Sequence, residues 1–559
     1  LFSDWLYLLS AIAPIVWWVV ENVNLVERVG GPVPTSIVVF AGLLVAVSFD
    51  MARRVIGPVI PLIGFFFLIY TFKPIAQSMP GLLFHDGFGL ARVMEFLMLE
   101  ADGLTGLIVE VFATYIVIFV VLGAFLEKTG LGAILIDTTF RLTGQHTGGP
   151  AMTAVISSGL FGMISGSGVA NVVTTGSFTI PMMKRLGYRA RFAAAVEACA
   201  SSGGQITPPI MGAAAFIIAE FLRVSYLTVV VAAIVPTFLY FSTVYFMVHL
   251  EADKHDIQRV PKHLLPSFWK VMKNGWHLLL SLVVLVALLV YGFTATMSAF
   301  WAIIVLTLLT FINANTRMSP VDLLSAFETG VRSTIPVSIA CACAGIIIGS
   351  IFVSGLGVKF TQSVIELSHG YLFLLLMLTA IAAILLGMGI TTTAVYITVA
   401  ALIVPVLIEA GVNPMAAHMF AFYYGVVSTI TPPVALASFA AAAIAGSSPM
   451  ATAVESARIG VAKYLVPFVF VYNPSLLFEG PLWLTAYSTV TAFAGVWALS
   501  LCLEGWHRAP LAMGPRIVVG CGGILAMFPP MLFPFGVSGF VLDAAGLALI
   551  AAITLPGRG

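Results

Sequence analysis

The sequence predicts an all-α polytopic membrane protein that contains an internal repeat. Of its 559 residues, 60% are hydrophobic and only 9% are charged, whereas soluble globular domains carry about 25% charged residues. Many apolar stretches are long enough for a membrane-spanning helix, which needs about 20 residues. Runs such as residues 278–290 lack the alternation of β-barrel strands. The tetrapeptide Ile-Thr-Pro-Pro occurs twice, at residues 206–209 and 430–433, inside segments otherwise expected to be helical.

The apolar segments follow one another along the whole chain. The run at 5–20 has no small-residue cleavage site after it, so we expect a membrane helix rather than a signal peptide. The segment 74–102 mixes acidic residues with Leu and Met and is expected at the membrane interface or in a loop. The expected apolar segments are 5–20, 35–49, 56–72, 105–126, 147–184, 189–222, 226–249, 275–291, 297–313, 334–353, 371–408, 413–445, 451–473, 483–500, 515–533 and 537–555.

The basic residues predict the orientation, because Lys and Arg accumulate on the cytoplasmic side of a membrane. The loops richest in them are 53–54, 184–191 and 254–273. These loops share one side if the N-terminus is cytoplasmic and segment 147–184 returns to the side from which it entered. We therefore expect 147–184 to be a re-entrant hairpin. The net charge of +1 gives no indication of a nucleic-acid partner.

The two Ile-Thr-Pro-Pro sites belong to a duplication with an offset of 224 residues. In this register Pro181 matches Pro405, Gly187 matches Gly411, and one residue of slippage further upstream matches 130–132 with 355–357. The loop 184–191 holds four basic residues, whereas its counterpart 408–415 holds none and one Glu. The two loops are thus expected on opposite sides of the membrane. Inverted repeats with broken helices are typical of secondary transporters, which bind substrate near the membrane midplane.

Each proline pair predicts a helix break that exposes backbone carbonyl groups. Unpaired carbonyls are costly in lipid, so we expect them to line a polar cavity or to bind a cation, with Thr207 and Thr431 adding hydroxyls. Upstream of each break lies a glycine-rich tip, at 165–175 and 387–393, that precedes a half-helix whose N-terminal end favours an anion. The simpler alternatives are helix packing through small residues and a structural kink. The residues expected to bind a carboxylate substrate are Ser167, Asn171, Thr174, Thr391, Thr392 and Thr393.

Glu197 is a carboxylate within an apolar segment, ten residues before Thr207. An ionisable residue at membrane depth suggests a function, here the transport of a coupling proton. Alternatively, Glu197 neutralises Arg189 or Arg191, or pairs with a neighbouring helix.

Three motifs resemble the large membrane component of tripartite ATP-independent periplasmic (TRAP) transporters. They are Ser-Gly-Ser-Gly-Val-Ala-Asn-Val-Val-Thr-Thr-Gly from Ser165, the run from Glu197 to Pro209, and Gly-Met-Gly-Ile-Thr-Thr-Thr from Gly387. The resemblance covers roughly residues 100–475. It implies an elevator-type transport domain and a scaffold, with ion-driven uptake of small organic acids delivered by a soluble periplasmic binding protein. The helices before and after this region are similar to those of fused permeases, with small and large subunits in one chain, that work with TAXI-type binding proteins.

The resemblance also implies a domain organisation in the inner membrane of a bacterium or archaeon. A fused chain is expected to work as a monomer. The expected parts are small-subunit-like scaffold helices at 1–104; the start of the large-subunit-like region at 105–144; a first inverted repeat at 145–249 with hairpin 147–184 and broken helix 189–222; a cytoplasmic connection and scaffold helices at 250–333; a second inverted repeat at 334–473 with hairpin 371–408 and broken helix 413–445; and additional C-terminal membrane helices at 474–559.

In the TRAP family, Na⁺ binds between the hairpin tips and the helix breaks. Carried onto this chain, the first Na⁺ site comprises Ser165, Ser167, Asn171, Gly203 and Thr207, and the second comprises Gly387, Gly389, Thr392, Ser428 and Thr431. Val395 takes the place of Asn171 in the second tip, so the two sites are not equivalent. TAXI-type systems also leave proton coupling open. No organic cofactor is expected.

Two other classes of function are weaker alternatives. A membrane-embedded enzyme needs a catalytic constellation, but the sequence has no HExxH or GxSxG motif and no nucleotide-binding P-loop. A passive channel needs neither occluding hairpins nor tight ion sites. Accumulation of a solute against its gradient, only when binding protein is present, distinguishes a transporter from a channel. The sequence does not name the substrate.

Overall fold

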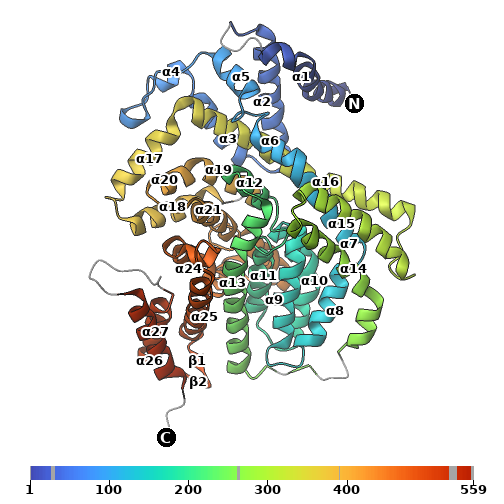
Figure 1. Cartoon of the computed structure of the whole chain (residues 1–559), viewed down its shortest axis with the longest axis vertical. Helices are drawn as coiled ribbons and strands as arrows, with labels where there is room; N and C mark the ends of the chain where they lie inside the picture. Colours follow the sequence, from blue (N-terminus) through green and yellow to red (C-terminus); the bar gives the residue numbers. More distant parts are fainter. Residues whose placement is uncertain are drawn as a thin grey trace. The chain divides into compact units, whose positions relative to one another are not determined.

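The computed structural model describes residues 2–26, 32–257, 259–260, 265–388, 391–527 and 538–555, and these residues form an almost entirely helical protein (Figure 1). Seven of the described helices are long and apolar enough to cross a membrane, and an eighth span results if the bent pair Leu436–Ala445 and Pro449–Tyr472 counts as one. The predicted all-α polytopic class is therefore confirmed. The described strands are limited to the short hairpin β1 (Trp506–His507) and β2 (Ala509–Pro510).

The helices of the first half include two that the sequence did not suggest as separate elements, α8 and the short α4. They are α1 (Phe2–Val26), α2 (Thr35–Val55), α3 (Val59–Tyr70), α4 (Lys73–Ala76), α5 (Leu90–Leu99), α6 (Leu107–Val111), α7 (Val117–Lys128), α8 (Leu131–Thr143), α9 (Gly149–Ser165), α10 (Gly168–Arg185), α11 (Ala190–Gly204), α12 (Ala214–Leu222), α13 (Tyr226–Lys254) and α14 (Phe268–Val290), with a 3₁₀ turn η1 (Gly81–Leu83) and a π-helical turn η2 (Phe112–Ile116).

The second half contains α17, which was likewise not expected as a separate helix. Its elements are α15 (Ala295–Leu309), η4 (Thr310–Ile312), α16 (Pro320–Ser354), α17 (Leu356–Leu367), α18 (Leu372–Leu386), α19 (Thr392–Leu402), α20 (Val404–Glu409), α21 (Pro414–Val427), α22 (Leu436–Ala445), α23 (Pro449–Ile459), α24 (Ala462–Tyr472), η5 (Pro474–Leu477), α25 (Leu482–Glu504), α26 (Met513–Leu525) and α27 (Gly539–Thr554).

Helix boundaries in the two halves recur at the offset expected from the sequence. Helices α10 and α19 begin at Gly168 and Thr392, and α11 and α21 begin at Ala190 and Pro414, both pairs 224 residues apart. The two unexpected helices, α8 and α17, each follow a glycine with positive φ, of 79° at Gly130 and 64° at Gly355. A positive φ is readily adopted only by glycine, which explains why these two helices begin where they do.

The chain divides into two compact units, which we describe separately. Unit 1 comprises Leu1–Val117, Val331–Thr379 and Ile390–Gly411. Its core is formed by residues of α2, α5 and α16, such as Leu44, Leu97 and Ile346, all of which are buried. Helix α16 comes close to residues 103–104 at Gly345, where an added Cβ would lie 2.8 Å from the Gly103 carbonyl oxygen.

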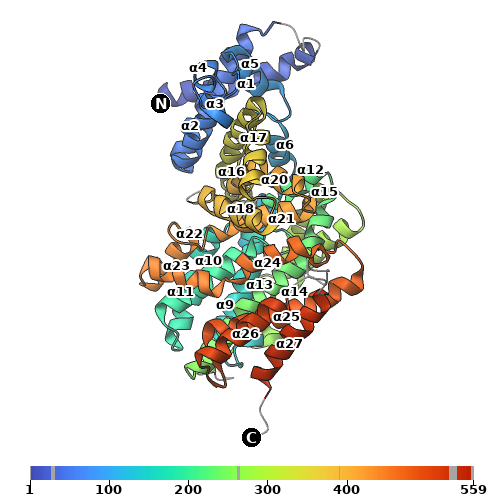
Figure 2. The same cartoon turned by 90° about the vertical axis from the view of Figure 1, so that its left-hand side faces the viewer.

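Unit 2 comprises Ile118–Gly330, Ala380–Gly389 and Val412–Gly559. In it, α9 and α10 form a hairpin that packs on α11, and α22 and α23 lie beside α10 and α11 (Figure 2). The C-terminal helix α25 packs on α13 and α26, and α26 packs on α27, around buried Leu250, Ala498 and Val519. Both proline-broken helices thus lie in the same compact unit.

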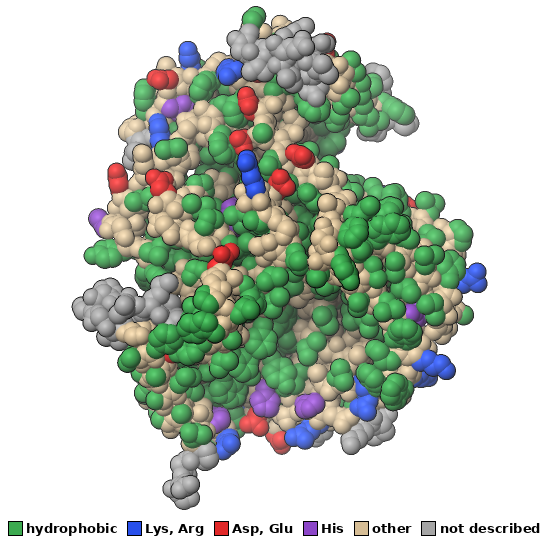
Figure 3. Space-filling model, in the orientation of Figure 1, with side chains coloured by type: hydrophobic (Ala, Val, Ile, Leu, Met, Phe, Trp, Pro, Cys, Tyr) green, Lys and Arg blue, Asp and Glu red, His purple; other side chains and the backbone are tan. Residues whose placement is uncertain are grey.

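The surface of unit 2 is consistent with a membrane environment. In the lower half of Figure 3, hydrophobic side chains cover a broad band, and charged and His side chains gather along the lower edge. Trp269, at the start of α14, is 80% exposed, which fits its expected place at the interface.

Candidate functional site

The first hairpin turns where the sequence places its glycine-rich tip. Helix α9 ends at Gly166, whose φ is 64°, and α10 begins after Ser167, whose hydroxyl accepts a hydrogen bond from the Ala170 N–H at 3.4 Å. The two arms run antiparallel, since the Ser158 hydroxyl on α9 lies 2.8 Å from the Thr175 hydroxyl on α10. Segment 149–185 is therefore a helical hairpin and not one continuous helix.

The first helix break follows Gly204 as expected from the proline pair. The peptide bonds between Pro208 and Pro209 and between Pro432 and Pro433 are both cis. The Thr207 hydroxyl donates to the Gly203 carbonyl at 2.9 Å and so satisfies one of the carbonyls that the prolines expose. The Cα of Gly203 faces α13, because an added Cβ would lie 2.5 Å from the ring of Tyr240. Gly203 thus offers only its carbonyl group to the break.

The hairpin tip lies directly against this break. A Cβ on Gly166 would lie 3.3 Å from the Gly212 Cα, and one on Gly168 would lie 3.0 Å from the side-chain nitrogen of Gln205. Deeper in the hairpin, a Cβ on Gly162 would lie 2.9 Å from the Gly204 Cα. Glycine at these positions allows two backbones to approach closely.

Two buried amide oxygens near the tip have no hydrogen-bond partner. Asn171 is fully buried, and its Nδ2 donates to the Ser158 carbonyl at 2.8 Å and to the Ser201 hydroxyl at 2.9 Å, but its Oδ1 is unpaired. The Oε1 of Gln205, which is 2% exposed, is also unpaired. A buried polar atom without a partner is costly. Such oxygens suit a cation, and sequence reasoning missed Gln205.

The other residues of the predicted first site lie close to the tip but face differently. The Ser165 hydroxyl lies 3.4 Å from the carbonyls of Gly162 and Ser167. Ser167 and Thr174 are exposed, whereas Asn171 points into the contact between the hairpin and α11. The exposed face of α10 is therefore the part of this set that is open to a substrate.

Glu197 joins the hairpin to the broken helix. It is fully buried, and four hydroxyls donate to its carboxylate, from Ser158 at 2.5 Å, Thr175 at 2.6 Å, Thr179 at 2.5 Å and Ser201 at 3.0 Å. These hydroxyls come from α9, α10 and α11, so the carboxylate is a shared acceptor for all three helices.

The second set of predicted residues is only partly described. A Cβ on Gly387 would lie 2.6 Å from the Ser428 hydroxyl oxygen, so these two residues are neighbours in unit 2. The Thr431 hydroxyl donates to the Val427 carbonyl at 2.7 Å and lies 2.6 Å from the Tyr464 hydroxyl. Gly389 lies outside the described residues.

The three threonines of the second tip begin α19 in unit 1. Thr391, Thr392 and Thr393 are all half-buried. The Thr391 hydroxyl oxygen is buried without a partner, which makes it available to a ligand.

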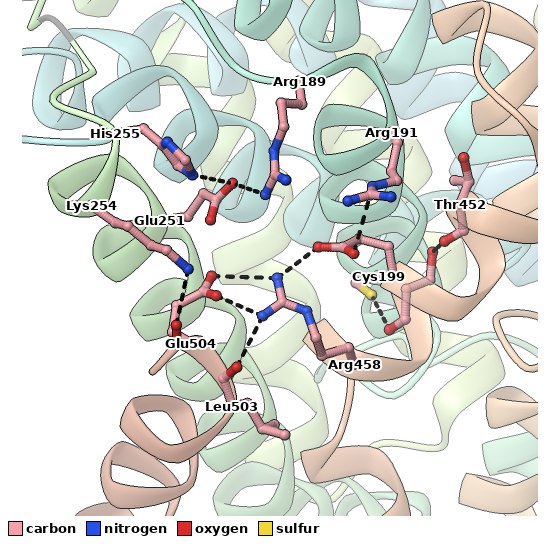
Figure 4. A network of polar contacts seen from close by, with 12 residues as sticks. Arg189, Arg191, Cys199, Glu251, Lys254, His255, Thr452, Arg458, Leu503 and Glu504 are labelled. Carbon is pink, nitrogen blue, oxygen red and sulfur yellow. Dashed lines mark hydrogen bonds and ion pairs between the residues drawn. The ribbon is translucent and has the colours of Figure 1, made fainter. Parts of the chain in front are cut away.

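A polar network ties the start of α11 to α13, α23 and α25 (Figure 4). Arg458 donates to Glu504 at 2.6 Å and to Glu455 at 2.6 Å. Arg189 pairs with Glu251 at 2.5 Å, and Arg191 lies 3.9 Å from Glu455. The two arginines near Glu197 in sequence therefore pair with other carboxylates, and Glu197 itself has hydroxyl partners.

A helical hairpin folded against a proline-broken helix, in a chain with seven described helices of spanning length, is the architecture of a multi-pass secondary transporter. Residues 41–480 match the family "Tripartite ATP-independent periplasmic transporter, DctM component", and the chain belongs to this family. The members are transporter permeases and not enzymes. Membership places the protein in a bacterial inner membrane and gives it a periplasmic substrate-binding protein as partner.

The curated relatives are distant but cover most of the matched region. The C4-dicarboxylate TRAP transporter large permease protein DctM of Pseudomonas aeruginosa is 26% identical over 409 residues, 71% of this chain and 94% of that protein. The 2,3-diketo-L-gulonate TRAP transporter large permease protein YiaN of Escherichia coli is 25% identical and covers 56% of this chain and 74% of its own length. The isethionate TRAP transporter permease protein DctMQ of Oleidesulfovibrio alaskensis is 22% identical, with 59% of this chain and 52% of that protein covered.

Proposed function

We propose that the protein takes up a small organic acid, driven by an ion gradient, after a soluble periplasmic protein delivers it. The observation that carries this proposal is the hairpin tip lying on the helix break, with the buried oxygens of Asn171 and Gln205 left unpaired. The names of the relatives, which include a C4-dicarboxylate and a diketo-gulonate transporter, support an anionic substrate.

The chemistry of the first hairpin suits a carboxylate and a cation together. The N-terminal end of α10 favours negative charge at the tip, and the exposed Ser167 and Thr174 offer hydroxyls on the same helix. The Na⁺ that we propose as the coupling ion would neutralise substrate charge and fill the unpaired oxygens. The residues that would hold it are Asn171, Gln205 and the Gly203 carbonyl. Proton coupling through Glu197 is the alternative.

The recurrence of helix boundaries at an offset of 224 residues supports two inverted repeats that work as an elevator. The basic residues of 184–191 and their absence from 408–415 support opposite orientations and a cytoplasmic N-terminus. Helix α1 precedes the family match and α25–α27 follow it, which supports a fused permease of the TAXI type. We propose that such a chain works as a monomer.

Uptake into sealed vesicles under separately imposed gradients tests this function. The protein is reconstituted with its cognate binding protein, and succinate, 2-oxoglutarate and glutamate serve as probe acids. We expect at least one acid to accumulate against its gradient only when a Na⁺ or a proton gradient and the binding protein are both present. Equilibration without any gradient indicates a channel and contradicts the proposal.

The same assay identifies the role of the first helix break. Thr207→Ala removes one hydroxyl, and we expect the apparent affinity for the coupling ion to weaken by about 1.5–3 kcal/mol. Thr207→Ser keeps the hydroxyl and is the matched control. An unchanged ion response in Thr207→Ala excludes this residue from the ion site.

A further inference from the structure

Lys463, in the first turn of α24, is a fully buried lysine that the family motifs do not include. Its Nζ donates to the Ser202 hydroxyl at 2.7 Å and lies 4.4 Å from the centroid of the Tyr240 ring. Within the described part of the chain, no carboxylate forms an ion pair with it. A buried ammonium without a carboxylate is costly, so its retention indicates a function.

The Lys463 amine lies where the two broken helices meet. Ser202 is in the last turn of α11, and its hydroxyl lies 3.0 Å from the hydroxyl of Thr429, just after α21, and 3.4 Å from the Val426 carbonyl. The C-terminal ends of both helices therefore converge on one ammonium. Helix C-termini favour positive charge, and hydroxyl and carbonyl oxygens of this kind also suit a free cation.

The titratable groups around Lys463 include no carboxylate that is free to pair with it. Those around it are Cys199 on α11, Tyr240 on α13, Tyr423 and Tyr424 on α21, and its neighbour Tyr464. The carboxylates on the helices nearby are engaged elsewhere, Glu197 by hydroxyls and Glu455 by Arg458. The charge of Lys463 is thus balanced by helix ends, oxygens and an aromatic ring alone.

We propose that Lys463 is a built-in cation at the junction of the two broken helices and that it carries a coupling proton. Unlike arginine, a buried lysine can release its proton. Protonated, the amine fills the oxygens of Ser202 and the helix ends; neutral, it leaves that position without positive charge. This inference rests on the proposed transport function. It assigns the junction to a proton and not to a metal ion, and it is separate from the hairpin site at Asn171.

Vesicle uptake of the probe acid that the wild type accumulates tests the coupling. Lys463→Met keeps most of the volume and removes the charge. We expect it to lose accumulation driven by a pH gradient and to keep exchange of the acid at equal concentrations. Accumulation equal to the wild type under a pH gradient overturns the inference while the transport function stands. Absence of accumulation by the wild type under any gradient contradicts the transport function itself.

Chemical rescue separates a charged role from a structural one. Thermal unfolding of the full-length Lys463→Ala protein in lipid nanodiscs is measured with propylammonium chloride, n-propanol and NaCl. We expect propylammonium, which replaces the missing side chain, to raise the unfolding midpoint of Lys463→Ala more than that of the wild type. Equal responses of both proteins to propylammonium and n-propanol overturn the assignment of a cation site.

Discussion

Replacement of Arg458 by methionine is expected to lower the free energy of unfolding by about 3 kcal/mol. The guanidinium bridges Glu455 on α23 and Glu504 on α25, and the side chain of Glu504 is only 1% exposed. Without Arg458, both carboxylates remain at a poorly solvated contact without their main partner. Breaking a buried pair is costly because it leaves an uncompensated charge. Because Arg458 is 26% exposed, we place the effect at the lower end of the range.

Arg53→Met is the matched control for this experiment. The Arg53 side chain is 64% exposed and pairs with Asp50 at 2.8 Å, and Asp50 also pairs with Arg54. An exposed ion pair contributes at most about 1 kcal/mol. Denaturant unfolding in detergent micelles measures both variants. Equal losses for Arg458→Met and Arg53→Met contradict a structural role for the network that holds α25 to α23.

Gly204→Ala is expected to destabilise the hairpin contact and to abolish most transport. The added Cβ would meet the backbone of Gly162 on α9 and, at 2.9 Å, the Met163 nitrogen, and a backbone cannot turn aside as a side chain can. Overpacking of this kind costs about 1–3 kcal/mol. Helices α9 and α11 must separate, which moves the hairpin tip away from the helix break. Vesicle uptake and thermal unfolding measure the two effects.

Gly42→Ala provides the control for an added methyl group. Gly42 lies within α2, and nothing lies within 4 Å of its added Cβ. Alanine is favoured over glycine in a helix by about 0.5–1 kcal/mol, so this variant is expected to be as stable as the wild type or slightly more stable. Full transport by Gly204→Ala refutes the close approach of the hairpin to α11.

Local signals explain why the hairpin and the helix breaks were predictable from the sequence. Glycine and proline act on the backbone where they stand, so 147–184 was expected to fold back and the structure turns it at Gly166. Helices α8 and α17 escaped prediction because they are 13 and 12 residues long and contain polar residues. Neither is long or apolar enough to stand out as a membrane segment.

The partners of the site residues depend on tertiary contacts that the sequence does not contain. Four hydroxyls from three helices surround Glu197, and only one of them, on Ser201, is a neighbour in its own helix. Gln205 was missed because a single amide beside a break carries no pattern. Lys463 had a usable signal, since it is a charged residue within the expected apolar segment 451–473.

The sidedness of the two hairpins tests the central claim most directly. In a Cys521→Ser background, since Cys521 is exposed, single cysteines replace four exposed residues at the ends of the hairpins, His146 and Arg185 for the first, His369 and Glu409 for the second. A membrane-impermeant maleimide is applied to right-side-out and inverted vesicles. Two inverted, re-entrant hairpins predict that positions 146 and 185 react only from the cytoplasmic side and that 369 and 409 react only from the opposite side. Labelling of the two ends of either hairpin from different sides would contradict the account.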